Sequence, residues 1–573
     1  MVVTANSHAT RAAFEILQDR GNAVDAAIAA QWVLNIVEPQ SSGIGGGGFF
    51  LYYEAATKRI YTFDGRETAP QEVYPEIFLE GQDQPVPFKP NRITGGRPVG
   101  VPGTLALLQE VHERFGTKRF SFSGLLNPAI EIAERGFPVS KRLAYFLNQE
   151  KERLALFEAS RGIFLKKDGS PYREGEILLQ KDIAKTFRLI QQQGMRVFYE
   201  GEIAEAIVQA VRNSPVNPGL MKREDLAHYH AVERMPVHGR YRNYDVFSMG
   251  PPSSGGVTLI EILNILENFQ LDLLGRTPNG VHVFLEAQKL AFEDRNEFLG
   301  DPDFVEIPIA ELLSKPFAEK KTQEINYQTA VPTGREGIRT LMLEPANTTH
   351  LSIVDGWGNM VSFTSTIEEI FGSAMVVPGY GFVLNNELTD FDAEPTARRT
   401  DRTAPQDQAP DRRSFKRRHR MTKRSSAAEP TGAESKKSGT ILKPNAPEGG
   451  KRPRSSMTPT FVFNGGKPVL VLGSPGGSAI IGTVLNLIVN LLDFGMPATE
   501  AMKLDRMIHR GEEVELESAL FRNQELKREL MRRGHRVMEK EAIGNAQMIY
   551  FDPEENIWVG VSDPRGEGEA LGR

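Results

Sequence analysis

Paired strands joined by tight turns are the feature that most restricts how this sequence can fold. Residues 349–366 alternate apolar and polar side chains on either side of an Asp-Gly-Trp-Gly turn, and residues 460–473 repeat the form around Asn-Gly-Gly. Residues 546–563 read as another hairpin, and residues 42–53 are predicted to pair with residues 59–67 across a short polar link. These patterns are typical of antiparallel strand pairs.

Helices are predicted between these strand pairs. Ser7 is expected to cap a helix that ends at Gly21, and Asn22 is expected to start an apolar helix through Ile36. The apolar stretch at residues 477–492 predicts a buried helix. Amphipathic helices are also predicted at residues 104–114, 122–135, 183–193, 258–268 and 281–298. Strand pairs with helices on their faces favour a layered α/β sandwich over a chain of alternating βαβ units.

Segments that would span or target a membrane are not evident in the sequence. No stretch of the 573 residues approaches 18 consecutive apolar residues, and the first twenty lack the pattern of a signal peptide. We therefore expect a soluble chain without a membrane span. Its compartment would be the cytoplasm as the sequence stands, or the periplasm or exterior if an N-terminal segment was removed.

The absence of cysteine removes several chemistries together. Without cysteine, disulfides, thiolate metal sites, iron–sulfur clusters and cysteine nucleophiles are excluded. A nucleophile in this chain must therefore be serine, threonine, lysine or a carboxylate.

Cofactor motifs are also missing. The glycines at residues 43–48 fit G-x-G-x-x-G, but they follow a predicted helix and enter a strand, the reverse of a dinucleotide site. The glycines at residues 473–482 lack the Gly-Lys-Ser/Thr of a phosphate-binding P-loop, and neither H-E-x-x-H nor G-x-S-x-G occurs. We therefore expect no cofactor and no metal.

One basic segment differs in composition from the rest of the chain. The whole chain has a net charge of −6, too balanced to indicate a nucleic-acid binder. Residues 396–444 alone carry fourteen Lys and Arg against five Asp and Glu, a net charge of +9, with few aliphatic residues. We expect a disordered insert here. The alternative is a basic arm that binds nucleic acid, an anionic polymer or a membrane.

The sequence Asn347-Thr348-Thr349 precedes a predicted strand and offers a nucleophile. A threonine hydroxyl needs a neighbouring base, and its own α-amino group, with a pKa near 8, can serve. Because Thr348 is internal, this chemistry requires the chain to cut itself between Asn347 and Thr348. Taken alone, the Thr-Thr pair is better explained by the strand propensity of β-branched residues, and only the surrounding sequence favours a nucleophile.

Motifs around this site resemble the γ-glutamyltransferase (glutathione hydrolase) family of N-terminal nucleophile hydrolases. They are NTTHLSIVDGWGNMVSFTST, GSPGGS, RPRSSMTPT, NNELTDF and DGRETAP, together with NAVDAAIAA and IGGGGF near the start of the chain. The resemblance covers nearly the whole chain outside the insert. It implies an α+β fold, a four-layer αββα sandwich. It also implies maturation into a helix-rich large subunit, residues 1–347, and a small subunit, residues 348–573, that begins with the nucleophile.

The resemblance also implies catalytic roles. Thr348 would be the nucleophile of self-cleavage and of catalysis, and Thr366 would support it with a second hydroxyl. Gly476 and Gly477 would form the oxyanion hole. This role suits glycine, since two glycines allow close backbone approach and their N–H groups can point at one developing oxyanion.

Substrate-binding roles follow from the same resemblance. The residues implied at the substrate's α-carboxylate are Arg66, Ser455 and Ser456, and those implied at its α-amino group are Glu387 and Asp390. A guanidinium with two hydroxyls suits a carboxylate. Where the family pattern has Asn two residues after the second threonine, this chain has Glu368. The amino-binding corner would then hold three carboxylates, which favours a cationic ammonium or a different acyl group.

The expected function is an autoprocessing γ-glutamyl hydrolase and transferase acting on glutathione and related amides. Its partners would be a γ-glutamyl donor, with water or an amino-acid or peptide acceptor, and the two subunits of one precursor. Within the same fold, the alternative is an amidohydrolase for a glutaryl-cephalosporin, oxamate or poly-γ-glutamate. From a different class, a non-catalytic binding protein is disfavoured by the intact Thr348, Thr366, Arg66 and glycine pair.

Overall fold

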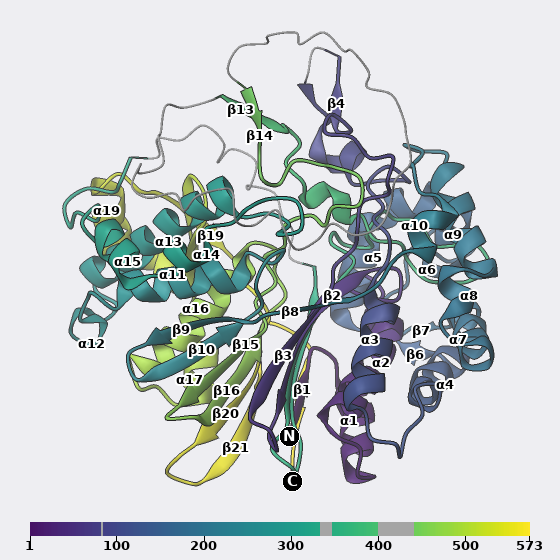
Figure 1. The fold of residues 1–573 in the computed structure, drawn as a ribbon, viewed down its shortest axis with the longest axis horizontal. Coiled ribbons are helices and arrows are strands. Elements are labelled where there is room, and N and C mark those ends of the chain that lie inside the picture. Colours follow the sequence, from purple (N-terminus) through teal and green to yellow (C-terminus); the bar gives the residue numbers. More distant parts are fainter. Residues whose placement is uncertain (82–83, 333–346, 399–439) are drawn as a thin grey trace, which may run out of the picture.

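Two antiparallel sheets lie face to face at the centre of the fold, in a computed structural model that describes residues 1–81, 84–332, 347–398 and 440–573 (Figure 1). The seven-stranded sheet has the order β22 (Glu569–Leu571), β1 (Val2–Thr4), β11 (Thr349–Val354), β12 (Met360–Thr366), β2 (Gly47–Glu54), β3 (Arg59–Gly65) and β8 (Val232–Arg234). The six-stranded sheet has the order β21 (Ile557–Ser562), β20 (Gln547–Asp552), β16 (Lys467–Gly473), β15 (Thr460–Asn464), β10 (Tyr244–Ser248) and β9 (Val237–Tyr241). The four predicted strand pairs are confirmed as β2–β3, β11–β12, β15–β16 and β20–β21.

Alternation along the strands separates the layers of the sandwich. Phe50 and Tyr52 of β2 belong to an apolar cluster shared with helices α1–α9, whereas Phe49 and Leu51 belong to a second cluster shared with the other sheet. Successive side chains of a strand point to opposite faces. One face of β2 therefore meets helices, and the other face fills the space between the sheets.

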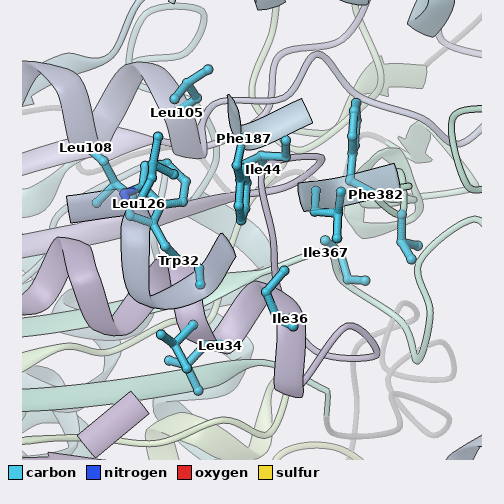
Figure 2. Packing of buried hydrophobic residues seen from close by; sticks show 14 of the residues in the cluster. Trp32, Leu34, Ile36, Ile44, Leu105, Leu108, Leu126, Phe187, Ile367 and Phe382 are labelled. Atoms are coloured by element: carbon cyan, nitrogen blue, oxygen red, sulfur yellow. The ribbon is translucent and has the colours of Figure 1, made fainter. Parts of the chain in front are cut away.

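The first helical layer covers the outer face of the seven-stranded sheet. Its helices are α1 (Ser7–Gln18), α2 (Ala23–Val37), α3 (Thr104–Phe115), α4 (Asn127–Arg135), α5 (Lys141–Ala155), α6 (Glu158–Phe164), α7 (Lys181–Gln193), α8 (Arg196–Tyr199), α9 (Glu202–Arg212) and α10 (Arg223–Ala227). Trp32 of α2 packs edge-on against Phe187 of α7, with ring centroids 5.7 Å apart. Figure 2 shows these two rings in one buried cluster with Ile36, Ile44 and Ile367. The cluster thus supports the loop that leaves α2.

The second helical layer lies on the six-stranded sheet and completes the four-layer αββα sandwich. Its helices are α11 (Gly255–Leu266), α12 (Leu271–Leu274), α13 (Pro278–Phe298), α14 (Ile309–Leu312), α15 (Lys315–Thr322), α16 (Ala479–Leu492), α17 (Ala498–Lys503), α18 (Ser518–Arg522) and α19 (Gln524–Arg532). A small sheet of β17 (Met507–His509), β18 (Glu513–Glu517) and β19 (Arg536–Lys540) adjoins them. Two short hairpins, β4 (Leu79–Glu80) with β5 (Gln84–Pro85) and β6 (Phe137–Pro138) with β7 (Ile177–Leu178), lie in the connections. None of the helices in the described ranges is long and apolar enough to cross a membrane.

The N-terminal cap is predicted correctly for α2 but not for α1. The prediction that Ser7 caps α1 is wrong by one residue, because the side chain of Asn6 accepts the hydrogen bond from the backbone N–H of His8. The prediction for α2 is confirmed. Asn22 accepts from the first turn, and Asp25 completes a reciprocal capping box.

The predicted disordered insert is ordered at its two ends. Residues Thr396–Arg398 form β13 and residues Thr440–Leu442 form β14, and the two strands pair antiparallel. The expectation of disorder over all of residues 396–444 is therefore wrong for these ends, because backbone pairing holds them without a large apolar contribution. Residues 399–439 lie outside the described residues.

Candidate active site

The β11–β12 hairpin brings the two predicted catalytic threonines together. Thr348 directly precedes β11, and Thr366 ends β12. Because Thr349 pairs with Ser365, the start of one strand lies beside the end of the other. The Oγ1 atoms of Thr348 and Thr366 lie 3.3 Å apart, and both residues are buried.

The hydroxyl of Thr366 also contacts the peptide bond that precedes Thr348. Its Oγ1 donates to the carbonyl oxygen of Asn347 at 3.3 Å and accepts from the backbone N–H of Glu368 at 2.8 Å. Glu368 has a φ of +75°, in the left-handed region that few non-glycine residues adopt. One hydroxyl thus lies between the attacking oxygen and the carbonyl it would attack.

Gly476 and Gly477 form the turn between β16 and α16. Their φ angles are +140° and +53°, conformations that favour glycine. Neither amide N–H donates a hydrogen bond to another described residue. The turn also lies at the N-terminus of α16, where the helix dipole is positive. This arrangement can stabilise a developing negative charge on oxygen.

Arg66 follows β3 directly and is 1% exposed. Its guanidinium binds the carboxylates of Glu387 and Asp390, which begin and end one short 3₁₀ helix. It also donates to the backbone carbonyls of Pro453 at 3.1 Å and Arg454 at 3.2 Å. The residues expected at the two ends of a substrate head group therefore form a single ion-pair network.

A further carboxyl group, that of Glu67, adjoins this network and was not anticipated from the sequence. Glu67 is fully buried, and burial raises its pKa to about 8 although Arg66 opposes this shift. Burial also raises the pKa of Glu387 above its usual range, and the nearby carboxyl group of Glu67 raises it further. Both carboxyl groups therefore favour the protonated form more than a solvent-exposed glutamate does. In the sequence, the only indication of a role for Glu67 is its position next to Arg66.

The two predicted serines, Ser455 and Ser456, are hydrogen-bonded to residues of helix α13 and of the chain that enters α11. Arg295 of α13 donates to Ser456 Oγ at 2.7 Å and to Ser254 Oγ at 2.8 Å. Ser254 in turn donates to the carbonyl oxygen of Ser455 at 2.6 Å, and Ser455 Oγ accepts from the N–H of Met457 at 3.1 Å. Each of these two serine hydroxyls already accepts a hydrogen bond, so its own O–H can donate a hydrogen bond to an anionic group. Arg295 was also missed, because a helical arginine is ordinarily solvated.

One small cavity of about 30 Å³ brings most of these groups together. Its lining consists of Arg66, Asn347, Thr348, Thr366, Glu368, Glu387, Asp390, Ser455, Ser456, Met457, Gly477 and Ile480. Every residue proposed from the sequence lies there except Gly476, which is adjacent to a lining residue. The cavity thus places two threonine hydroxyls, a glycine turn, one cation and several carboxylates around a single space.

A group of side chains elsewhere has the composition of a metal site. His282, Glu286 and His535 are buried, and they are the one such group found among the described residues. His282 Nδ1 and His535 Nε2 lie 2.7 Å apart, and His282 Nε2 contacts the Asn326 carbonyl oxygen at 2.8 Å. A metal ion would have to displace the bond between the two rings. None of the three residues lines the cavity at Thr348.

Comparisons with known proteins agree with this geometry. The family model described as "Gamma-glutamyltranspeptidase" matches residues 9–422 and 418–573. A glutathione hydrolase proenzyme of Bacillus subtilis strain 168 is 35% identical, across 100% of this chain and 91% of that protein. An acylase ACY 1 proenzyme of Pseudomonas sp. strain SE83 is 32% identical, across 99% and 92%. The crystal structure of a cephalosporin acylase from Bacillus halodurans superposes with a TM-score of 0.81 at 27% identity, across 99% of this chain and 94% of that one.

Proposed function

The chain belongs to the gamma-glutamyltranspeptidase family, and from this premise we propose that it cleaves itself and then hydrolyses or transfers γ-glutamyl groups of glutathione-like amides. The chain is an enzyme of the N-terminal nucleophile hydrolase fold. Its cleavage position, the roles of its residues and its substrate are the content of the proposal.

The contact among Thr348, Thr366 and the Asn347 carbonyl carries the proposal. In self-cleavage, the Thr348 oxygen attacks the carbonyl carbon of Asn347, and the Thr348 nitrogen leaves with the hydroxyl proton. The Thr366 hydroxyl lies between these groups, where it can pass that proton and bind the carbonyl oxygen. Water then hydrolyses the resulting ester and frees the Asn347 carboxylate. Thr348 regains its hydroxyl and gains an α-amino group.

The free α-amino group of Thr348 then serves as the base for catalysis. It takes the hydroxyl proton while the oxygen attacks the γ-amide carbon of the substrate, and it returns the proton to the departing amine. The N–H groups of Gly476 and Gly477 stabilise the oxyanion, an effect typically of about 3 kcal/mol for one donor. Water or an amino-acid amine then resolves the γ-glutamyl ester.

The substrate's head group is proposed to bind at the Arg66 network. Arg66 takes the α-carboxylate together with Ser455 and Ser456. Asp390 is the better placed of the two acidic partners of Arg66 to meet the α-ammonium, since its side chain is 20% exposed and that of Glu387 is 1% exposed. The substrate's head group is a zwitterion with one carboxylate and one ammonium. These are the same two kinds of charge that the Arg66 network already pairs.

A panel of anilides tests the substrate assignment. γ-Glutamyl and glutaryl anilides share the carboxylate and the scissile amide, and they differ only by one ammonium group. Loss of a charged contact worth about 2 kcal/mol predicts a preference of roughly 30-fold in kcat/KM for the γ-glutamyl compound.

The acylase relatives supply the second candidate. A protein that turned over the glutaryl anilide faster would be an acylase of this fold, and the γ-glutamyl proposal would fail. Self-cleavage would be unaffected by that outcome, since it depends on Thr348 rather than on the head-group site.

A further inference from the structure

We infer that the loop between α2 and β2 holds the side chain of Asn347 and so positions the scissile bond for self-cleavage. The inference rests on the self-cleavage proposed above. We name Gln40 and Ser41 of this loop the Asn347 clamp. Both lie directly before the glycine-rich stretch at residues 43–48, and the sequence analysis did not single them out.

The clamp binds both the oxygen and the nitrogen of the Asn347 carboxamide. Ser41 Oγ donates to Asn347 Oδ1 at 2.9 Å, and Asn347 Nδ2 donates to the carbonyl oxygen of Gln40. All three residues are at most 1% exposed, so water does not compete for these bonds. A carboxamide accepts through its oxygen and donates through its nitrogen. A carboxylate cannot make the second bond, and an apolar side chain makes neither.

The same loop is also hydrogen-bonded to the chain segment that follows Thr366. The Gln40 carbonyl also accepts from the N–H of Phe371 at 3.1 Å, and the Ser41 carbonyl accepts from the N–H of Ile367 at 3.3 Å. Ile367 directly follows Thr366. One stretch of backbone is thus bonded both to the residue whose carbonyl is attacked and to the segment that carries the relaying hydroxyl.

The loop has its own support, independent of Asn347. Its Ile44 N–H donates to Asn35 Oδ1 at 2.7 Å, and Gln31 of α2 donates to Ser42 Oγ at 3.2 Å. A Cβ atom at Gly43 would lie 3.0 Å from the Asn35 side chain, so this approach favours glycine. Ile44 also packs in the buried cluster that Figure 2 shows. The clamp is therefore preorganised.

Preorganisation matters because nucleophilic attack requires close, aligned atoms. Reacting atoms must approach to about 3–3.5 Å, and a misplacement of about 1 Å can cost roughly 100-fold in rate. A released Asn347 side chain would let its carbonyl rotate away from Thr348 and Thr366. We therefore expect loss of the clamp to slow self-cleavage between about 10-fold and 100-fold.

A double-mutant cycle on the full chain tests the clamp. The rate at which the intact chain disappears after synthesis is followed on denaturing gels for wild type, Ser41→Ala, Asn347→Ala and the double variant. Each single variant should cleave at least about 10-fold more slowly, and the double variant should cleave no more slowly than Asn347→Ala. Ser214→Ala is the matched control, because this buried serine bonds to Val216 and belongs to neither the loop nor the site, and it should cleave at the wild-type rate.

Several outcomes would overturn the inference. These are wild-type cleavage by Ser41→Ala, additive losses in the double variant, or wild-type cleavage by Asn347→Asp, which keeps the acceptor and loses the donor. If Ser41→Ala does not fold, as judged by its thermal melt, Asn347→Asp and Asn347→Ala still decide the matter, because they leave the loop intact. Cleavage of Thr348→Ala at the same bond would instead refute the proposed function. An uncut Thr348→Ala beside a normally cleaving Ser41→Ala would refute the clamp alone.

Discussion

Replacing Thr348 by alanine is expected to leave the chain in one piece, because the attacking hydroxyl is lost. The wild-type chain should appear on a denaturing gel as fragments of about 39 and 25 kDa, in proportion to residues 1–347 and 348–573 of a 63.7 kDa chain. Thr348→Ser keeps the hydroxyl and should cleave at a reduced rate. Fragments of these sizes from Thr348→Ala would show that another group attacks.

Substitutions at Asp390 and Arg66 test separately how the substrate's ammonium and its carboxylate are bound. Asp390→Ala should narrow the preference for γ-glutamyl over glutaryl anilide, because the proposed ammonium contact is lost. Its expected cost is about 2 kcal/mol, roughly 30-fold in kcat/KM. Arg66→Ala should weaken both anilides alike, since each carries the carboxylate. An unchanged preference in Asp390→Ala would remove this residue from the ammonium site.

His350 makes the free energy of unfolding sensitive to acid. It lies between the sheets, bonded to Thr364 Oγ1 at 2.8 Å and Ser352 Oγ at 3.1 Å, and burial lowers its pKa to about 3. The unfolded-state pKa is about 6.5, so the unfolded chain binds the proton first as pH falls. Stability that is present above pH 6.5 is therefore lost toward pH 3, by about 2 kcal/mol at pH 5.

The test compares thermal melts at pH 7.5 and pH 5. His350→Gln should lose less stability between these pH values than wild type, because glutamine takes up no proton. His230→Gln changes an exposed histidine and should behave as wild type. An equal acid loss in His350→Gln and wild type would contradict the assignment.

The site could be proposed from the sequence largely because its residues lie in contiguous motifs. Thr348 and Thr366 flank one hairpin, so a local turn brings them together. Glu67 and Arg295 were missed for a physical reason. The position of Glu67 beside Arg66 in the chain does not fix the direction of its side chain, and a helical arginine is usually solvated. Only the packed structure shows that both residues interact with residues that line the cavity.

At the scale of elements, the hairpins could be predicted and the order of the sheets could not. The turns of β11–β12 and β15–β16 carry their own sequence pattern. The pairing of β1 with both β11 and β22 joins residues hundreds of positions apart, and no local pattern specifies it. The short β9 and β10 were missed as well, because they carry few apolar positions and depend on β15 and α11 for their cover.

Removal of residues 399–439 is expected to leave folding intact. Arg398 and Thr440 are paired neighbours at the open end of β13 and β14, so a short Gly/Ser link can join them. The deleted residues contain few apolar groups to bury, and shortening a loop changes its closure entropy only slowly. The thermal midpoint should shift by at most a few degrees, and self-cleavage should persist. Loss of either would mean that the segment contributes to the fold.

At the scale of the whole molecule, the two expected subunits are interleaved within the same sheets. In the seven-stranded sheet, β1 lies between β22 and β11, and β12 lies beside β2. In the six-stranded sheet, β10 pairs with β15. Four hydrogen-bonded strand pairs thus cross between residues 1–347 and 348–573.

The cleaved fragments should therefore stay together until the fold is denatured. Size-exclusion chromatography with light scattering should give the wild-type protein the same native mass as uncut Thr348→Ala, while only wild type separates into two bands in denaturant. Elution of free fragments under native conditions would contradict this. The partner strands would then have to be replaceable by solvent, which the buried sheets do not allow.

The position of β1 also imposes an order on the assembly of the seven-stranded sheet. Residues 2–4 pair with residues 351–353 and 569–571, and the two marked ends of the chain lie together in Figure 1. A ribosome working at about 5–20 residues per second needs roughly half a minute or more between the first of these strands and the last. Until then, β1, which borders the hairpin that carries Thr348, lacks one of its own two neighbours. The edge of the sheet beside this hairpin is therefore complete only after translation has passed residue 571.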